Sequence, residues 1–261
     1  MTRRREVRFR FNYLRVFTQD YILGKTISMV VSLAEMLVLF VRRPSRSLAR
    51  LFGSILKIKP KYSMLSTVRL LNLYYLAQET ERLNLKGDVV ECGVWNGGAA
   101  AMAASAYFDT GKQVHRTIWL FDSFEGLPPP GEKDNKAEVE CYFQGLCKGS
   151  VENVRDIFHR LSLSMEEVKI VRGWLHETLK SNDIKQAALL HIDTDWYESV
   201  KLPLEHFYGK IVAGGFIVVD DYWFHQGCKA AVHDFFKEHD LDGKIQLKKV
   251  DRSAVYFQKP R

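Results

Sequence analysis

Short runs of β-branched and aromatic residues alternate with helical stretches from residue 88 onward, and this alternation limits the folds open to the chain. It predicts seven strands, at residues 88–92, 117–122, 168–172, 187–193, 214–220, 245–250 and 254–258. Helices are predicted after four of them, at 98–108, 151–161, 199–209 and 228–239. Strands that alternate with helices indicate a parallel sheet with helices on both faces.

The last two predicted strands are joined only by the residues "DRS" at 251–253. A connection this short cannot hold the crossover helix that parallel strands need, so this pair is expected to be antiparallel. A mostly parallel seven-stranded sheet with such a C-terminal hairpin is characteristic of the Rossmann-like α/β fold of class I methyltransferases. We therefore predict that fold, with a helical extension at the N-terminus.

The turn after the first strand, in "DVVECGVWNGG" (88–98), is the first candidate ligand site, because parallel sheets bind ligands at the carboxyl ends of their strands. The dinucleotide fingerprint G-x-G-x-x-G has a glycine at its third position, where Trp95 stands here, and an indole there would block a pyrophosphate. No Walker A sequence follows. The turn, with Gly93 and Trp95 as candidate contacts, therefore suits S-adenosylmethionine, which has no phosphate between its nucleoside and its reactive end.

Further cofactor contacts are predicted at the ends of the first three strands. Asp122, with Ser123 beside it, ends the second strand, where a carboxylate can accept hydrogen bonds from both ribose hydroxyls. Glu91 would lie under the amino-acid part of the cofactor, and Gly173 and Trp174 would lie beside the adenine. A turn-forming Asp122, a structural Glu91 and a core Trp174 stay open as alternatives.

Four aspartates lie at the ends of two predicted strands that should be neighbours in the sheet: Asp193, Asp195, Asp220 and Asp221. Crowded carboxylates repel one another unless a cation lies among them, and oxygen ligands without His or Cys suit Mg²⁺. We assign Asp193, Asp220 and Asp221 to the metal and Asp195 to the role of general base, which takes the proton from an acceptor hydroxyl. The reverse roles for Asp193 and Asp195, and helix capping by these residues, stay open.

The segments "GDVVECGVWNGGAA", "LFDSFEGLP", "HIDTDWYES" and "GGFIVVDDY" followed by "GCKAAVHDFF" resemble the macrocin O-methyltransferase (TylF-type) family over residues 60–258. The resemblance implies a metal-dependent enzyme that methylates sugar hydroxyls. It also implies the same metal ligands and base, cofactor contacts around Glu91, Gly93 and Asp122, and a mobile lid at 61–73 that includes Met64. Asn96 and Thr194 depart from the expected pattern and leave the acceptor open.

Residues before and beside these motifs carry weaker predictions. The stretch 62–87 is predicted to form an amphipathic helix with Val68, Leu71 and Tyr75 on its apolar stripe, closing over the ligand site. The insertion within 123–150 has the length of a functional loop. His225 is expected to be a solvent-exposed loop residue, and His191 to pack against a helix.

The N-terminus differs from the rest of the chain. Residues 1–60 form a basic, hydrophobic extension, predicted to be helical, and 61–261 form the methyltransferase domain. The net positive charge of the chain, +7, comes from this extension, because residues 61–261 carry more acidic than basic residues. The apolar stretch 27–41 is open to three interpretations: a membrane span, an interfacial helix, or a helix packed on the domain or on a second copy of the chain. We expect a cytoplasmic protein, with peripheral membrane contact through residues 1–50 and homo-oligomerisation both open.

The predicted function is S-adenosylmethionine-dependent and Mg²⁺-assisted methylation of a sugar hydroxyl on a glycosylated metabolite or glycan. One alternative is a catechol-type O-methyltransferase with a phenolic acceptor, which would use the same metal chemistry. The other is a non-catalytic adaptor that binds a membrane or nucleic acid through the basic N-terminus. No nucleic-acid recognition motif supports a nucleic-acid partner, and the four cysteines show no spacing typical of zinc or of a disulfide framework.

Overall fold

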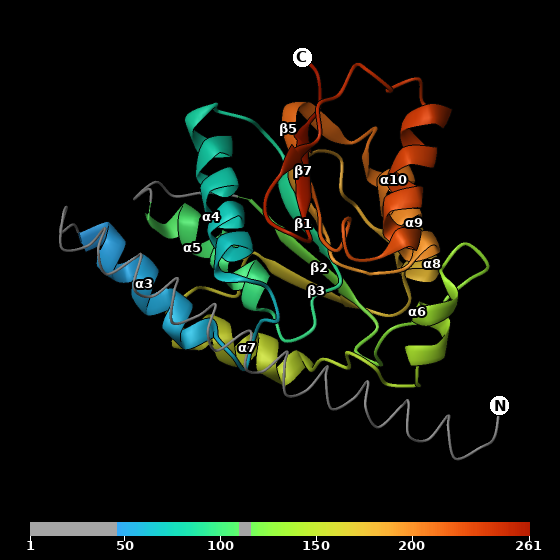
Figure 1. The fold of residues 1–261 in the computed structure, drawn as a ribbon. Coiled ribbons are helices and arrows are strands. Elements are labelled where there is room, and N and C mark those ends of the chain that lie inside the picture. The colour runs from blue at the N-terminus through green and yellow to red at the C-terminus, as the bar shows by residue number, and fades with distance from the viewer. Residues whose placement is uncertain (1–45, 110–115) are drawn as a thin grey trace.

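A computed structural model describes residues 46–109 and 116–261 of the protein (Figure 1). The stretch 27–41 lies outside the described residues, as do residues 1–45 of the segment considered for membrane contact. None of the helices in the described ranges is long and apolar enough to cross a membrane.

The centre of the fold is a seven-stranded sheet with the order β3-β2-β1-β4-β5-β7-β6. Its strands are β1 (Asp88–Cys92), β2 (Ile118–Asp122), β3 (Val168–Arg172), β4 (Ala187–Ile192), β5 (Ile211–Val219), β6 (Lys248–Lys249) and β7 (Val255–Gln258). The first five strands are mutually parallel, and β7 is antiparallel to both β5 and β6. The predicted fold class and its C-terminal hairpin are therefore confirmed.

Five of the seven strands have bounds that differ from the prediction, by one residue at β2 and β7 and as follows at β4, β5 and β6. β4 ends at Ile192, so that Asp193 begins the loop that follows, and β5 begins at Ile211, before the predicted start. β6 has only two paired residues, because Ile245 and Leu247 instead pack against the hydrophobic core beside α10. The alternation of apolar and polar residues at 245–250 therefore arises from this packing as well as from strand pairing.

Helices cover both faces of the sheet (Figure 1). One face carries α3 (Arg46–Ile58), α4 (Thr67–Arg82), α5 (Gly98–Asp109) and α7 (Val151–Arg160). The other carries α8 (Leu175–Thr178), a 3-10 turn η2 (Leu179–Ser181), α9 (Tyr197–Phe207) and α10 (Gln226–Glu238). A short helix, α6 (Lys136–Cys141), lies in the insertion after β2.

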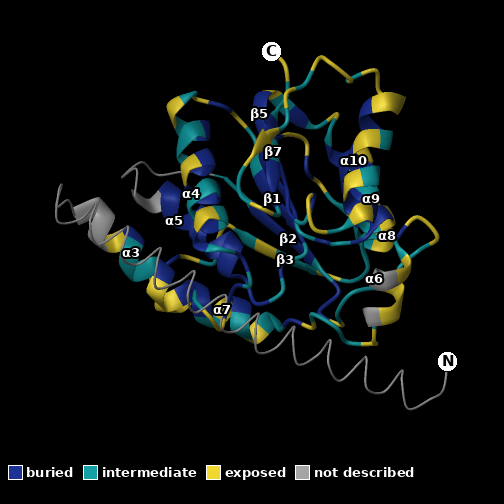
Figure 2. Ribbon diagram, in the orientation of Figure 1, coloured by how far each residue is buried: buried dark blue, intermediate teal, exposed yellow. Residues whose placement is uncertain are grey.

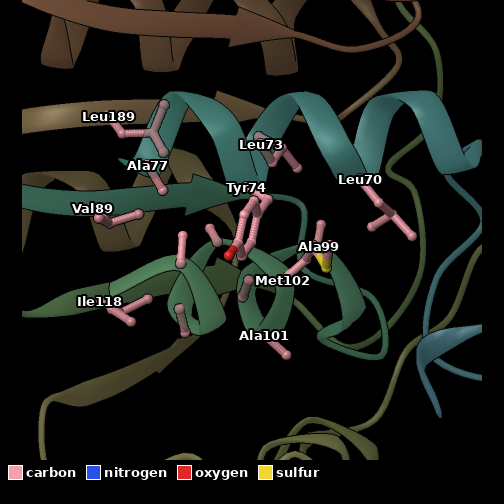
Figure 3. Packing of buried hydrophobic residues seen from close by; sticks show 14 of the residues in the cluster. Leu70, Leu73, Tyr74, Ala77, Val89, Ala99, Ala101, Met102, Ile118 and Leu189 are labelled. Atoms are coloured by element: carbon pink, nitrogen blue, oxygen red, sulfur yellow. The ribbon is translucent and has the colours of Figure 1, made fainter. Parts of the chain in front are cut away.

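Burial follows this three-layer arrangement, with the central strands buried and the outer helix faces exposed (Figure 2). Figure 3 shows α4 packing through Leu70, Leu73 and Ala77 onto the sheet and α5. The predicted stripe of α4 is wrong, because Val68 and Tyr75 are exposed. In "VRLLNLYYL" apolar residues occupy nearly every position, so more than one helical face could be chosen, and contact with the alanine-rich α5 selects the face with Leu70, Leu73, Tyr74 and Ala77.

α3 lies within the predicted extension, yet it packs on the main body. Its residues Leu51, Ile55 and Ile58 are buried in the core that α4, α5 and α7 share. The described part of the extension is thus continuous with the methyltransferase domain.

Candidate active site

A cavity of about 1570 Å³ lies at the carboxyl ends of the parallel strands. The strand ends and the loops after them supply most of its lining, and the segment before α4 supplies Met64 and Leu65. Among the predicted site residues, those that line it are Met64, Gly93, Trp95, Asp122, Ser123, Gly173, Trp174, Asp193, Asp195, Asp220 and Asp221. Eleven of the twelve candidates therefore meet at one cavity.

The turn after β1 needs glycine because it passes close to the end of β4. Gly93 has a φ of +86°, and a Cβ atom there would lie 1.9 Å from the carbonyl oxygen of Asp193. The Asp193 amide donates to the Cys92 carbonyl (2.9 Å), which fixes the two loops side by side. The cofactor turn and the carboxylate cluster are therefore built as one unit.

Asp122 shapes this turn through its carboxylate. Its Oδ2 accepts hydrogen bonds from the amides of Val94 (2.7 Å) and Trp95 (2.8 Å), and its Oδ1 accepts from Phe124 (2.7 Å). Burial raises the pKa of Asp122, and these three bonds act in the opposite direction. Asp122 therefore does hold the turn, as the turn-forming interpretation proposed. Asp122 also lines the cavity, and its binding to a ribose stays a prediction.

Glu91 is the candidate that the structure separates from the large cavity. It is buried in β1, where its Oε1 lies 2.8 Å from Nδ1 of His191 in the neighbouring strand β4, which is also buried. Burial raises the pKa of the Glu91 carboxyl, and the hydrogen bond from His191 opposes that shift. His191, predicted to pack against a helix, lies beside Ala99, Ala100 and Ala103 of α5 and also pairs with this acid. The role of Glu91 beside the cofactor stays a prediction.

The four aspartates converge, and three of them form a compact oxygen cluster. One carboxylate oxygen each from Asp193, Asp195 and Asp221 lies within 4.8 Å of the others. Asp221 also accepts a hydrogen bond from Ser253 (2.8 Å). The fourth, Asp220, is buried beside them and pairs with Arg69 of α4. The geometry thus groups Asp195, the predicted base, with two of the three predicted metal ligands.

The charges of the cluster are poorly compensated. Burial, followed by repulsion from neighbouring carboxylates, raises the pKa of Asp193 and Asp195 well above its ordinary value. Burial also raises the pKa of Asp220, although Arg69 opposes the shift. For Asp221 burial is outweighed by Arg69 and by hydrogen bonds from Asp195 and Ser253, so its pKa is lowered.

The donor set fits a hard divalent cation. All candidate ligands are carboxylates, and Oδ1 of Asp220 is buried without a hydrogen-bond partner. An unpartnered buried carboxylate oxygen is costly, and a cation among these oxygens would remove that cost and the mutual repulsion. Oxygen ligands without His or Cys favour Mg²⁺ or a similar ion over zinc.

Four non-glycine residues that line this cavity, Cys147 among them, have a left-handed backbone conformation, as do four other residues in the described ranges. Trp95, Asp195 and Asp221 have φ values of 49°, 63° and 53°, in the left-handed region that non-glycine residues rarely adopt. Strained conformations persist where the surrounding structure fixes them, and they cluster at functional sites. No residue pattern in the sequence marks these three positions as strained.

Two residues near the carboxylates were missed or misjudged from the sequence. His225 lines the cavity, with only 15% of its side chain exposed and Nε2 3.7 Å from Asp195, so the prediction of a solvent-exposed loop residue is wrong. Its ring packs against buried Trp196, which holds it inward. Arg69 was not predicted as a site residue. A cation in the first turn of a helix is unfavourable beside the positive end of the helix dipole, so its presence there is a sign that an acidic group lies nearby.

The insertion after β2 forms one wall of the cavity and is held by hydrogen bonds to the start of α9. Oδ1 of Asp134 accepts from the amide of Tyr197 (2.9 Å) at the start of α9, and its Oδ2 accepts from Gly131 (2.7 Å). The indole of Trp196 donates to the carbonyl of Pro128 (2.9 Å). Beyond this anchored part, Phe143 and Leu146 line the cavity, as expected for a functional loop.

Comparison with known proteins shows the family of the chain. The macrocin O-methyltransferase (TylF) family matches residues 53–259. Demethyldecarbamoylnovobiocin O-methyltransferase of Streptomyces niveus is 32% identical over 207 residues, which are 77% of this chain and 76% of the relative. Mycinamicin III 3''-O-methyltransferase of Micromonospora griseorubida is 30% identical over 205 residues, 76% of this chain and 78% of the relative.

Solved structures extend the comparison to the fold. The O-methyltransferase NovP superposes with a TM-score of 0.70 at 32% identity, covering 77% of this chain and 83% of NovP. The calicheamicin methyltransferase CalS11 has a TM-score of 0.61 at 17% identity, covering 88% of this chain and 91% of CalS11. The chain is an O-methyltransferase, and it belongs to the macrocin O-methyltransferase (TylF) family.

Proposed function

We propose that this enzyme transfers the methyl group of S-adenosylmethionine to a sugar hydroxyl of a glycosylated metabolite, with assistance from Mg²⁺. The observation that carries the proposal is the meeting of the carboxylate cluster and the glycine turn at one cavity, in a chain about one third identical to sugar-modifying relatives. The relatives' names describe acceptors derived from novobiocin and mycinamicin III.

The cofactor would occupy the side of the cavity formed by the ends of β1, β2 and β3. Gly93 and Trp95 offer a turn without space for a pyrophosphate, and the Asp122 carboxylate lies beside it. The Gly173 amide donates to the Asp122 carbonyl (3.0 Å), which places Trp174 at the same wall, where its ring can contact an adenine. The Asp122 carboxylate can accept hydrogen bonds from ribose hydroxyls. The other contacts are uncharged and would not repel the positive sulfonium.

The acceptor would enter on the other side, past an apolar rim. Phe143 and Phe224 both line the cavity although 53% and 60% of their surfaces are exposed to solvent. Large exposed apolar side chains at a cavity are typical of ligand contacts. They suit an acceptor that presents an apolar aglycone next to the methylated sugar.

The chain's own residues would activate the hydroxyl. When bound among the carboxylates, a divalent cation lowers the pKa of an acceptor hydroxyl. Asp195 holds its carboxylate within 4.8 Å of oxygens of Asp193 and Asp221, where it can take the hydroxyl proton, and His225 lies 3.7 Å from it. The hydroxyl oxygen then bonds to the methyl carbon as the carbon–sulfur bond breaks, and S-adenosylhomocysteine leaves.

The test is methyl transfer from labelled S-adenosylmethionine to two acceptor panels, one of glycosides and one of catechols, with Mg²⁺ or EDTA. Transfer to glycosides that stops in EDTA supports the proposal. Transfer to catechols alone would replace it with the phenolic alternative. Absence of S-adenosylmethionine binding to the folded protein would contradict it and favour the adaptor.

A further inference from the structure

We propose that Arg69 is a positioning residue that takes the electrostatic place of the divalent cation in the cation-free enzyme and thereby couples the first turn of α4 to the state of that site. The inference rests on the proposed function, since it presumes the cation site. The Arg69 side chain is 16% exposed and lines the cavity. Its Nη1 pairs with Oδ2 of Asp220, and its Nε lies 3.3 Å from Oδ2 of Asp251.

The first turn of α4 is held to the same two acids. Asp251, in the loop between β6 and β7, accepts a hydrogen bond from the hydroxyl of Ser66 (2.7 Å), which is the N-cap residue of α4. The Ser66 hydroxyl in turn accepts from the amide of Arg69 (3.1 Å). Met64 and Leu65, which precede Ser66, line the cavity. Contacts of Arg69 and Ser66 with Asp220 and Asp251 therefore fix the segment that lines this part of the cavity.

A divalent cation and the guanidinium compete for Asp220. Both are positive, and both are attracted to the same buried group of carboxylates, so each weakens the binding of the other. Occupancy of the site is expected to loosen the pair between Arg69 and Asp220 and to leave α4 held by Asp251. The first turn of α4 is then expected to move more freely.

The direction in which Mg²⁺ affinity changes when Arg69 is replaced distinguishes this role from a purely structural one. Titration calorimetry with Mg²⁺ alone on Arg69→Met should show binding about tenfold tighter or more than in the wild type, because a competing charge has been removed. If Arg69 merely aligned Asp220 as a ligand, the same variant would bind Mg²⁺ more weakly. Weaker or unchanged binding overturns the proposal. Arg82→Met is the matched control, since Arg82 lies on the same helix, exposed and paired with Glu79, and should leave the affinity unchanged.

Hydrogen exchange of the amides at 66–70 tests the coupling. In the wild type Mg²⁺ should speed this exchange, and in Arg69→Met the exchange should be fast with or without Mg²⁺. Unchanged or slower exchange on adding Mg²⁺ to the wild type overturns the coupling.

If Arg69→Met does not fold, the Mg²⁺ affinity of Asp251→Asn tests the proposal instead. This substitution leaves Asp220 as the acid paired with Arg69, so Mg²⁺ should bind more weakly, and equal or tighter binding contradicts the proposal. Neither measurement uses cofactor or acceptor. A result that contradicts the role of Arg69 can therefore be told apart from a failure of methyl transfer, which would contradict the proposed function.

Discussion

A Cβ atom on Gly93 would lie 1.9 Å from the carbonyl oxygen of Asp193, so the cofactor turn and the first carboxylate loop leave no room for a side chain between them. Gly93→Ala must therefore move one of the two loops, and it also places a Cβ at a φ of +86°. We expect a loss of unfolding free energy of about 4 kcal/mol or more, measured by denaturant titration. Gly209→Ala is the control, because a Cβ there meets no atom within 4 Å. Equal stability of the two variants would contradict this packing.

The roles of Asp193 and Asp195 can be separated by comparing binding with turnover. Asp195→Asn should lower kcat by about a hundredfold to ten-thousandfold, because the group that takes the proton is lost, while Mg²⁺ affinity is largely kept. Asp193→Asn should instead lose Mg²⁺ affinity. Titration calorimetry and single-turnover kinetics on both variants check this. The reverse result would assign the base to Asp193, which the close approach of both residues to Asp221 also allows.

The effect of Mg²⁺ on stability should depend on pH. A carboxyl whose pKa is raised in the fold stabilises the protein below its ordinary value of 3.8, and that contribution is lost as pH rises through the raised value. Asp193 and Asp195 are such groups, and a bound cation requires them ionised. The increase in Tm on adding Mg²⁺ should therefore be larger at about pH 8 than at about pH 5.5, by about 3 °C. NaCl at matched ionic strength is the control. Equal increases at both pH values would exclude a cation among these acids.

The apolar rim should contribute to acceptor binding rather than to catalysis. Phe224→Ala removes a side chain that is 60% exposed, so the fold should tolerate it, whereas the KM for a glycoside with an apolar aglycone should rise about tenfold with kcat kept. Trp223→Ala is the matched control, because Trp223 is the adjacent exposed aromatic residue and does not line the cavity. An equal KM change in both variants would indicate a surface effect without specificity.

The carboxylate cluster could be predicted because each part depends on local sequence. Alternation of strands and helices places Asp193 and Asp220 after neighbouring strands, and parallel strands end at one edge of the sheet. The same reasoning placed Gly93, Asp122 and Gly173 at the cavity. These predictions need only the order of the strands and the direction of the chain.

The remaining features depend on contacts between distant parts of the chain. Arg69 reaches Asp220 across 151 positions, and only the packing of α4 on α5 turns it toward the sheet. The same packing selects Leu70 and Leu73 as the buried face in a helix with apolar residues on several sides. Contact with Trp196 likewise turns His225 inward. Periodicity within one segment carries no information about these partners.

The attachment of the insertion through Asp134 bears on how new acceptor preferences could arise. This carboxylate fixes the loop at the start of α9, and a Cβ on Gly227 of α10 would lie 1.8 Å from its Oδ1, so the anchor is bound to both helices. Beyond it, the segment 135–148 carries Phe143 and Leu146 to the cavity without pairing to any strand, whereas Gly149 packs against the backbone of Trp95 in the cofactor turn. Lengthening or exchanging that segment changes the wall that meets the acceptor while the carboxylates and the cofactor turn keep their places. Substrate range and chemistry can therefore diverge independently in this scaffold, which makes the loop a natural graft point for redirecting the enzyme to other glycosides.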